Sequence, residues 1–286
     1  MKGIILAAGR GSRLYPMTRP ICKPLLPVYD KPMIYYPLAV LMQAGIRDIM
    51  IIIPPGEEGP FYRLLGNGSK WGINISYEVQ EVPRGIADAF LVAEKFVGED
   101  PVCLVLGDNI FHSPDIEHIM EKAGKIKEVG ATVFGYHVDD PRAFGVIEFD
   151  ANGNALSIEE KPRFPKSNYI VPGIYFYDNQ VIEIAHSLKP SARGELEITD
   201  VNIEYLKRGQ LHVIKLENDF TWLDAGTADN LLNAAQAVKK VQDDSGRYIA
   251  CLEEIAFKRK YITQKELDSL AGKLKQTLYG EYLMCL

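Results

Sequence analysis

Short apolar runs alternate with amphipathic segments over residues 3–109. Each apolar run is typical of a buried strand, and each segment between two runs spaces its apolar positions as a helix does. The predicted strands are 3–8, 48–54, 73–79 and 101–109, and the predicted helices lie near 33–45, 61–66 and 86–96. This alternation indicates a mostly parallel sheet with helices on both faces, whose ligands bind beyond the carboxyl ends of the strands.

Between residues 131 and 177 the helical spacing disappears. Stretches typical of strands are joined by short turns, one of them at Asn152-Gly153, and they lie at 131–138, 145–150, 155–160 and 168–177. Helices are predicted again near 180–187, 198–208 and 228–241. We therefore predict an α/β fold: a Rossmann-like, mostly parallel mixed sheet flanked by helices, with a catalytic unit over 1–244 and a helical appendix over 245–286.

Composition narrows the class of ligand. The 286 residues are 47% hydrophobic and 24% charged, as is ordinary for a soluble globular enzyme. A formal net charge of −6 argues against a nucleic-acid partner, and no apolar stretch reaches the roughly 20 residues that span a bilayer. The four cysteines lack C-x-x-C spacing, which suits a reduced chain. We expect a cytoplasmic protein with a small-molecule ligand.

The first strand runs into a loop with two glycines and two arginines, Gly9–Arg13. Leu14 stands where a dinucleotide fingerprint needs a third small residue, and the Gly-Lys-Ser/Thr of a P-loop is missing. Glycine backbone N–H groups can still approach an anion, with Arg10, Arg13 and Lys23 adding positive charge, which suits a polyphosphate. The alternative is an ordinary loop with solvent-facing arginines.

Two carboxylates follow apolar stretches. Asp108 ends a wholly apolar strand, where a carboxylate is costly unless a metal or another cation pairs with it. Asp224 follows Trp222 just before a predicted helix. The alternative interpretations are a helix cap for Asp108 and a helix-entry turn for Asp224.

Other polar residues at strand ends suit a nucleotide and a sugar phosphate. Lys161 is placed to reach a phosphate and Glu160 to accept hydrogen bonds from hydroxyls, unless both belong to a solvated strand end. Gln80 precedes Gly85 at a helix start, and its amide suits the edge of a nucleobase. The five histidines have no zinc-ligand spacing, and no Gly-x-Ser-x-Gly motif offers a nucleophile. This inventory describes a sugar nucleotide being made or unmade.

An ordered series of motifs extends this interpretation. The chain resembles the sugar nucleotidylyltransferases, and most closely the glucose-1-phosphate thymidylyltransferases, from Met1 to about Gln242 and more loosely beyond. The motifs are LAAGRGSRLYPMT with KPLLP, YDKPMIYYPL, LGDNIF, FGVIEFD, EEKP, PKSNY, KPSARGELEITD and TWLDAGT.

The resemblance implies a role for each matching residue. Arg13, Lys23 and Lys161 would be catalytic, and Asp108 and Asp224 would bind Mg²⁺. The residues implied for the nucleotide, with the last two reading the pyrimidine, are Leu6, Gly9, Gly11, Arg13, Gln80 and Gly85. Those implied for the sugar phosphate are Asn109, Gly145, Glu160, Lys161, Val171, Tyr175 and Arg193.

The implied reaction joins dTTP and glucose 1-phosphate to give dTDP-glucose and pyrophosphate. The sugar phosphate attacks the α-phosphorus in line, so no protein nucleophile is needed. The alternatives are a uridylyltransferase that uses UTP, and a non-catalytic nucleotide-sugar sensor. Three departures from the family pattern leave an altered sugar or a looser choice between thymine and uracil open: 84–89 reads RGIADA where DGLAQA is usual, Pro24 replaces a glutamine and Phe144 a tyrosine.

Residues 245–286 carry too much apolar surface to remain in water as a separate small element. One interpretation is a cover that packs on the chain's own catalytic unit. The resemblance favours the other: a homotetramer in which these helices make subunit contacts, with a second nucleotide-sugar site there for feedback by dTDP-rhamnose.

Overall fold

The structure is a computed structural model that describes residues 1–125, 130–217 and 219–286. Its strands are β1 (Lys2–Leu6), β2 (Pro27–Val28), β3 (Lys31–Pro32), β4 (Asp48–Ile53), β5 (Asn74–Val79), β6 (Val102–Leu106), β7 (Asn109–His112), β8 (Ala131–His137), β9 (Gly145–Phe149), β10 (Ala155–Glu160), β11 (Tyr169–Ile170), β12 (Ile174–Tyr177), β13 (Leu211–Lys215) and β14 (Thr221–Asp224). Its helices are α1 (Tyr35–Gln43), α2 (Glu58–Leu65), α3 (Asp88–Val92), α4 (Glu94–Val97), α5 (Ile116–Gly124), α6 (Gln180–Ser187), α7 (Ile198–Lys207), α8 (Ala228–Ser245), α9 (Leu252–Lys258), α10 (Gln264–Lys273) and α11 (Leu278–Met284).

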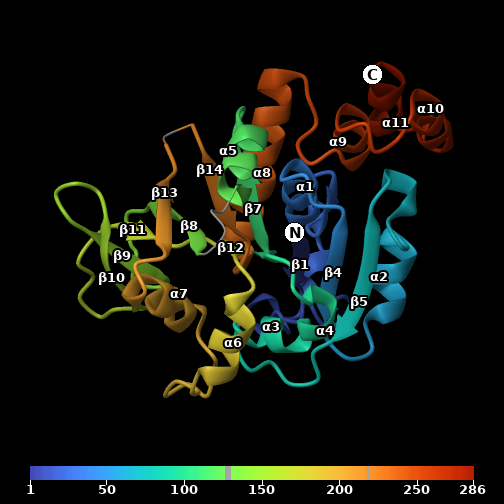
Figure 1. Ribbon diagram of the computed structural model, residues 1–286. Helices are drawn as coiled ribbons and strands as arrows, with labels where there is room; N and C mark the ends of the chain where they lie inside the picture. The colour runs from blue at the N-terminus through green and yellow to red at the C-terminus, as the bar shows by residue number, and fades with distance from the viewer. Residues whose placement is uncertain (126–129, 218) are drawn as a thin grey trace.

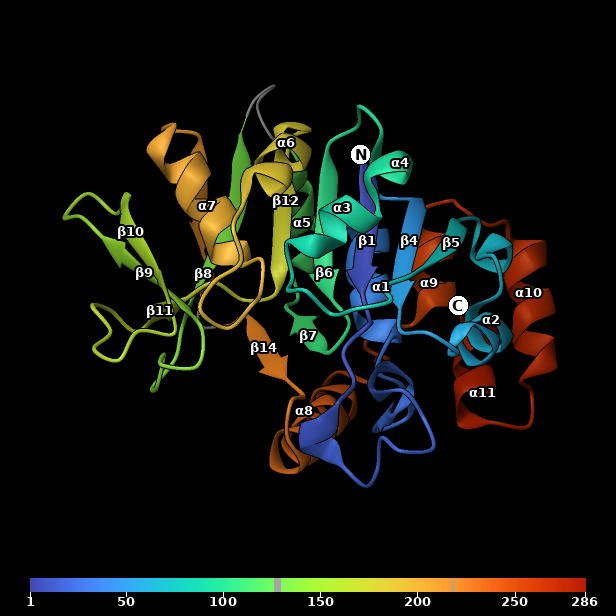
Figure 2. The ribbon, with the colours of Figure 1, turned by 90° about the horizontal axis from the view of Figure 1, so that it is seen from below.

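One sheet passes through the molecule, in the order β10-β9-β11-β8-β12-β6-β1-β4-β5 (Figure 2). Strand β13 pairs with β8 beside this path. Strands β6, β1, β4 and β5 are parallel to one another, whereas β12 is antiparallel to both β6 and β8. The predicted mixed sheet between helices is therefore confirmed. Its parallel half comes from the first part of the chain, and the middle of the chain adds the antiparallel strands.

Alternation along the central strands divides the core into two layers. Ile5 and Val105 enter the layer formed with α1, α5, α8 and α9, and Ile4 and Leu104 enter the layer formed with α3, α4, α6 and α7. Figure 1 shows the two groups of helices on opposite sides of the sheet. Because successive side chains of a strand point to opposite faces, both faces of β1 and β6 are apolar, which explains why these strands are continuous hydrophobic runs.

Three predicted elements are interrupted. The stretch 168–177 breaks into β11 and β12, because Pro172 has no N–H to donate to a sheet ladder. The helix predicted near 86–96 divides into α3 and α4. The strand predicted over 101–109 ends at Leu106, and the chain turns at Gly107-Asp108 into β7, which pairs with β14 in a separate two-stranded sheet. Strands β13 and β14 were not among the predicted elements.

The C-terminal helices pack on the chain's own parallel half. Leu252 and Leu267 are fully buried in the core layer that contains α1. The Trp71 indole N–H donates to Glu253 Oε1 at 2.9 Å, which ties α9 to the loop before β5. The tail therefore covers its own chain, as the first interpretation of its apolar surface expects, while its contacts with other subunits remain a prediction.

In the described ranges, no helix combines the length and the apolarity that crossing a bilayer requires.

Candidate active site

A cleft lies at the carboxyl ends of β1 and β6. These strands are adjacent and parallel, with Leu6 opposite Leu106, so their loops leave the sheet at the same edge. The Gly107 N–H donates to Leu6 O at 2.9 Å and joins the two loops. The cleft has a volume of about 330 Å³. The residues predicted for the site that line it are Leu6, Gly9, Arg13, Gln80, Gly85, Asp108, Asn109, Gly145, Glu160, Lys161, Val171, Tyr175, Arg193 and Asp224.

Two residues predicted for the site lie behind this lining. Lys23 is 6% exposed, and its Nζ donates to Asp108 Oδ2 at 2.5 Å. Gly11 lies in the left-handed region with φ +59°, and its carbonyl accepts from Thr18 Oγ1 at 2.7 Å. Lys23 therefore contacts Asp108, which lines the cleft, and does not line the cleft itself. Gly11 allows the turn of the loop that borders the cleft.

Asp108 and Asp224 approach each other from two paired strands. The β7–β14 register places Asp224 opposite Asn109, and the Ala225 N–H donates to Asp108 O at 3.1 Å. Burial and the nearby Asp108 raise the pKa of Asp224, with Lys23 and Arg13 opposing the shift. The helix-cap interpretation of Asp108 is wrong, because Asp108 precedes a strand. Asp224 ends β14, and the residue that caps α8 is Thr227, whose side chain accepts from the Asn230 N–H.

This pair of carboxylates fits a magnesium ion. Mg²⁺ is usually held by one or two carboxylates together with substrate phosphates and water. Within 1–125, 130–217 and 219–286, no three His, Cys, Asp or Glu side chains gather into a complete metal site. A cation bound by Asp108 and Asp224 would therefore complete its coordination with phosphate and water oxygens, and it would relieve the repulsion between the two carboxylates.

The loop Gly9–Arg13 borders the cleft and an adjoining hollow of about 300 Å³ that Arg10 also lines. Only a single 3-10 turn over Ser12–Leu14 follows its glycines, in agreement with the missing dinucleotide fingerprint. Arg13 and Asp224 meet across Gly226: a Cβ there would lie 2.9 Å from both Arg13 Nη2 and Asp224 Oδ2. The loop therefore brings its second arginine beside the acidic pair, while Arg10 and Arg13 both remain exposed to solvent.

The far end of the cleft is built on a strained residue. Lys161 has φ +46°, a backbone conformation that residues other than glycine rarely adopt, and its N–H donates to Phe144 O at 2.9 Å. Glu160 accepts from Thr199 Oγ1 at 2.5 Å and lies 3.4 Å from the Arg193 guanidinium. Backbone strain of this kind clusters at active sites, and of the four non-glycine residues with positive φ in the described chain only Lys161 lines the cleft. It turns Lys161 out of the strand and toward the cleft.

Gln80 and Gly85 form the opposite end. Gln80 is 5% exposed and follows β5 directly. Gly85 has φ +105°, and a Cβ there would lie 2.4 Å from Leu196 O, so only glycine allows this close approach of two backbone segments. The Leu196 N–H donates to Arg84 O at 2.7 Å, which fixes the loop.

Some lining residues were not predicted. Trp222 donates its indole N–H to Asn109 Oδ1 at 2.6 Å, and Thr199 holds Glu160. Both stand inside motifs that carry the family resemblance, so the buried polar and aromatic letters of TWLDAGT and KPSARGELEITD were the available signal. Of the departures from the family pattern, Ile86 and Phe144 line the cleft, whereas Pro24, Arg84 and Asp88 do not.

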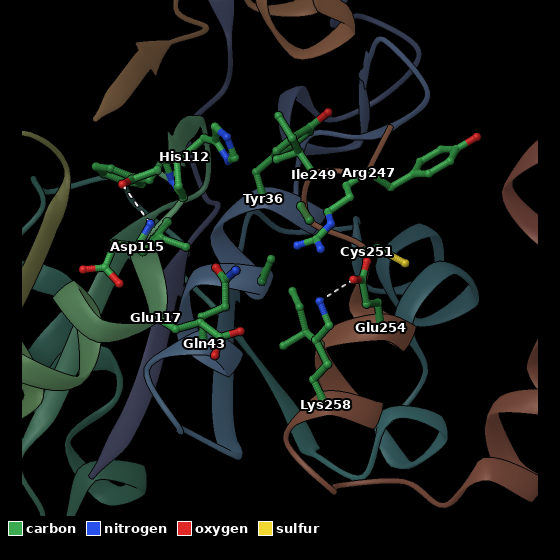
Figure 3. Close-up of a pocket in the computed structure, with 18 of the residues that line it drawn as sticks. Tyr36, Gln43, His112, Asp115, Glu117, Arg247, Ile249, Cys251, Glu254 and Lys258 are labelled. Carbon is green, nitrogen blue, oxygen red and sulfur yellow. Dashed lines mark hydrogen bonds and ion pairs between the residues drawn. The ribbon is translucent and has the colours of Figure 1, made fainter. Parts of the chain in front are cut away.

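A larger cavity, of about 830 Å³, lies between α1, α5 and the segment that joins α8 to α9 (Figure 3). Arg247 points into it, and Lys258 Nζ lies 2.6 Å from Glu254 Oε1 on its wall. His112 lines the opposite side of the cavity, and burial lowers the pKa of its imidazole. The cavity thus combines cationic, acidic and apolar groups at the start of the C-terminal helices.

Comparisons with known proteins agree on one family. The nucleotidyl transferase family profile matches residues 2–241. The chain is 55% identical to a glucose-1-phosphate thymidylyltransferase of Neisseria gonorrhoeae and 52% identical to one of Mycobacterium tuberculosis, in both cases over 99% of this chain and 98% of the relative.

Solved structures give the same result. A Bacillus anthracis protein described as a glucose-1-phosphate thymidylyltransferase, crystallised with sucrose, is 48% identical, with a TM-score of 0.77 over 83% of this chain and 94% of that one. A UDP-glucose pyrophosphorylase at 24% identity and a TM-score of 0.73, over 84% of this chain and 98% of that one, shares the fold. These findings confirm the resemblance seen in the sequence and do not favour the uridylyltransferase alternative. The chain belongs to the nucleotidyl transferase family and, within it, to the glucose-1-phosphate thymidylyltransferases.

Proposed function

We propose that this protein forms dTDP-glucose and pyrophosphate from dTTP and glucose 1-phosphate. One observation carries the proposal: a single cleft gathers the acidic pair, the cations Arg13 and Lys161 and the amide of Gln80, in a chain that is 55% identical to a thymidylyltransferase. These groups match the phosphates, the sugar phosphate and the base of the two substrates.

The chemistry follows from positioning and charge. A phosphate oxygen of glucose 1-phosphate attacks the α-phosphorus of dTTP, and the bond from that phosphorus to the pyrophosphate oxygen breaks. Lys161 binds the phosphate of the sugar, and Arg13 stabilises the charge that develops on the leaving pyrophosphate. Lys23 adds positive charge behind the cleft, where its ammonium donates to Asp108.

The hexose lies, in this proposal, at the end of the cleft where Glu160 is held by Thr199. The other polar and apolar groups there that surround it are Asn109, Gly145, Val171, Tyr175 and Arg193. Gln80 and Gly85 receive the base at the opposite end. With the hexose at one end and the base at the other, the phosphates of the two substrates meet between these ends, beside the acidic pair.

Asp108 and Asp224 would hold Mg²⁺, which neutralises phosphate charge and orients the two substrates when bound. Lys23 keeps Asp108 directed into the cleft, and Asn109 Nδ2 donates to its other oxygen at 2.9 Å. Both carboxylate oxygens are therefore oriented by the chain's own side chains.

A pyrophosphate-release assay with dTTP, glucose 1-phosphate and Mg²⁺ tests the proposal. Release that depends on both substrates supports it. Binding of dTDP-glucose without any release would instead favour the non-catalytic sensor. A cytoplasmic location belongs to the same proposal, supported by the free thiols of Cys22, Cys103, Cys251 and Cys285.

The larger cavity favours a second, regulatory function. We propose that it binds a deoxysugar nucleotide such as dTDP-rhamnose in a homotetramer, since its volume lies in the range of ligand pockets and Arg247 offers a partner for a phosphate. Leu278 and Met284, 76% and 55% exposed, remain for subunit contacts. Light scattering on the full chain and on Leu278→Arg tests the assembly: a tetramer that the substitution weakens is expected, and a monomeric parent chain would contradict it.

A further inference from the structure

We propose that Asp88 is a positioning residue that fixes the orientation of the Gln80 amide and thereby makes the cleft select thymine and uracil over cytosine. The inference rests on the proposed function of this cleft as a nucleotide site. It also assigns a role to Asp88, which stands where the family pattern has glutamine.

The contacts of Asp88 are specific and buried. Asp88 is 0% exposed, and its Oδ2 accepts from Gln80 Nε2 at 2.7 Å. Its Oδ1 lies 2.8 Å from Arg84 Nη2, an ion pair in which the arginine side chain is 60% exposed. Asp88 is the first residue of α3, but within the described residues its side chain forms no capping hydrogen bond with that helix. Its carboxylate is therefore directed at Gln80.

A carboxylate can only accept, so it decides which way the amide of Gln80 lies. Nε2 must face Asp88, and Oε1 must face away from it. Gln80 lines the cleft, and within the described residues its Oε1 accepts no hydrogen bond, which leaves this oxygen for a ligand. Of the two N–H groups of Nε2, one is anti and one is syn to Oε1; in this proposal the anti N–H donates to Asp88, which leaves the N–H beside Oε1 for a ligand. Gln80 thus offers one acceptor and one donor in a fixed order.

The backbone around this pair is also fixed. The Gln80 N–H donates to Ile53 O at 2.9 Å and continues the β4–β5 pairing. The segment that carries Arg84 and Asp88 is bonded on both sides to Leu196, with the Ala87 N–H donating to its carbonyl at 3.2 Å. Gln80 is therefore held before any ligand binds.

The fixed order of acceptor and donor distinguishes the pyrimidines. Thymine and uracil present N3–H beside the O4 carbonyl, which match Oε1 and the free N–H of Gln80. Cytosine presents an N3 acceptor beside an amino group, the reverse order. A freely rotating glutamine would turn by 180° to accept cytosine, but here that turn would place Oε1 against the carboxylate of Asp88, two acceptors without a proton between them.

The test compares dTTP with dCTP in the parent chain and in Asp88→Asn, which keeps the size of the side chain and replaces the carboxylate with an amide. An amide at position 88 can donate as well as accept, so it releases the constraint on Gln80. We expect the ratio of kcat/KM for dTTP to that for dCTP to fall at least tenfold, mainly through better use of dCTP. Glu204→Gln, which removes the acid of another i,i+4 ion pair with arginine, outside the cleft, should leave the ratio unchanged.

Binding separates this inference from the proposed function. Dissociation constants for dTTP and dCTP, measured by calorimetry without sugar phosphate, should show the same fall in selectivity. If the parent chain releases no pyrophosphate but Asp88→Asn loses selectivity in binding, the proposed function fails and the inference stands. A parent chain that does not discriminate between the bases, or a folded Asp88→Asn variant whose selectivity stays within twofold of the parent, would overturn it.

Discussion

The cleft and the larger cavity are built from different parts of the chain. The cleft is bordered by side chains close to the ends of strands, such as Asp108 two residues after β6 and Lys161 directly after β10. The larger cavity is enclosed by helices, connecting segments and the end of β7, around Tyr36, His112 and Arg247. In the first case a polar residue interrupts an apolar run and is visible in the sequence. In the second case the lining residues come together only through tertiary packing.

Asp108→Asn should have the largest effect on the cleft, a loss of turnover on the order of 10³-fold, because a neutral amide cannot balance a cation there. The measurement is pyrophosphate release at saturating Mg²⁺, with thermal unfolding to show that the fold persists. Asp268→Asn, exposed on α10, is the matched control. A rate equal to that of the parent chain would remove the acidic pair from the proposed site.

Arg13→Ala should lower turnover by on the order of 10²-fold, because the charge on the leaving pyrophosphate loses its partner. Arg13→Lys should restore activity only in part, since an ammonium cannot replace a bidentate fork. Arg63→Ala on α2 provides the comparison. A loss below about threefold for Arg13→Ala would return the loop to the ordinary connection that the sequence also allowed.

The sequence predicted the parallel half of the sheet well, because β1, β4 and β6 are long apolar runs buried on both faces. It did not predict β13 and β14. These strands are short, most of their residues are only partly buried, and their apolar and polar residues do not alternate clearly. Lys161 was predicted as a site residue, but its positive φ was not, since no local pattern specifies it. Long-range packing determines these features.

The contact between Lys23 and Asp108 illustrates the same limit. The sequence indicated that Asp108 needs a cation and that Lys23 contributes positive charge, but 85 positions separate them in the chain. Only the folded structure joins them directly. The motif TWLDAGT identified Asp224 and gave no indication that Trp222 supports Asn109. Motifs therefore predict which residues gather, and tertiary structure determines which pairs form.

The base end of the cleft should discriminate only weakly between thymine and uracil, which present the same hydrogen-bonding edge to Gln80. Thymine and uracil differ by one methyl group, worth roughly 1 to 3 kcal/mol in an apolar pocket. We expect measurable turnover with UTP beside dTTP, and much poorer turnover with ATP and GTP, because Gln80 matches the edge that the two pyrimidines share. Initial rates across the four triphosphates measure this, and a preference for ATP would show that the base end is assigned wrongly.

Arg247→Ala should have the smallest effect among these changes and should act on the larger cavity. Loss of one charge-assisted contact is expected to raise the inhibition constant of dTDP-rhamnose by about tenfold. Inhibition measured at several dTTP concentrations distinguishes the two cavities. An unchanged inhibition constant, or inhibition that disappears entirely at high dTTP, would place the inhibitor in the cleft and leave the larger cavity without a regulatory role.

Identifying the products by ³¹P NMR tests the central claim most directly. The full-length protein is incubated with Mg²⁺, dTTP and glucose 1-phosphate, and each substrate is omitted in turn. We predict that dTDP-glucose and pyrophosphate appear in equal amounts, only when both substrates are present, and that Asp108→Asn gives neither in the same time. Absence of dTDP-glucose with the complete mixture, or products formed without glucose 1-phosphate, would contradict the account.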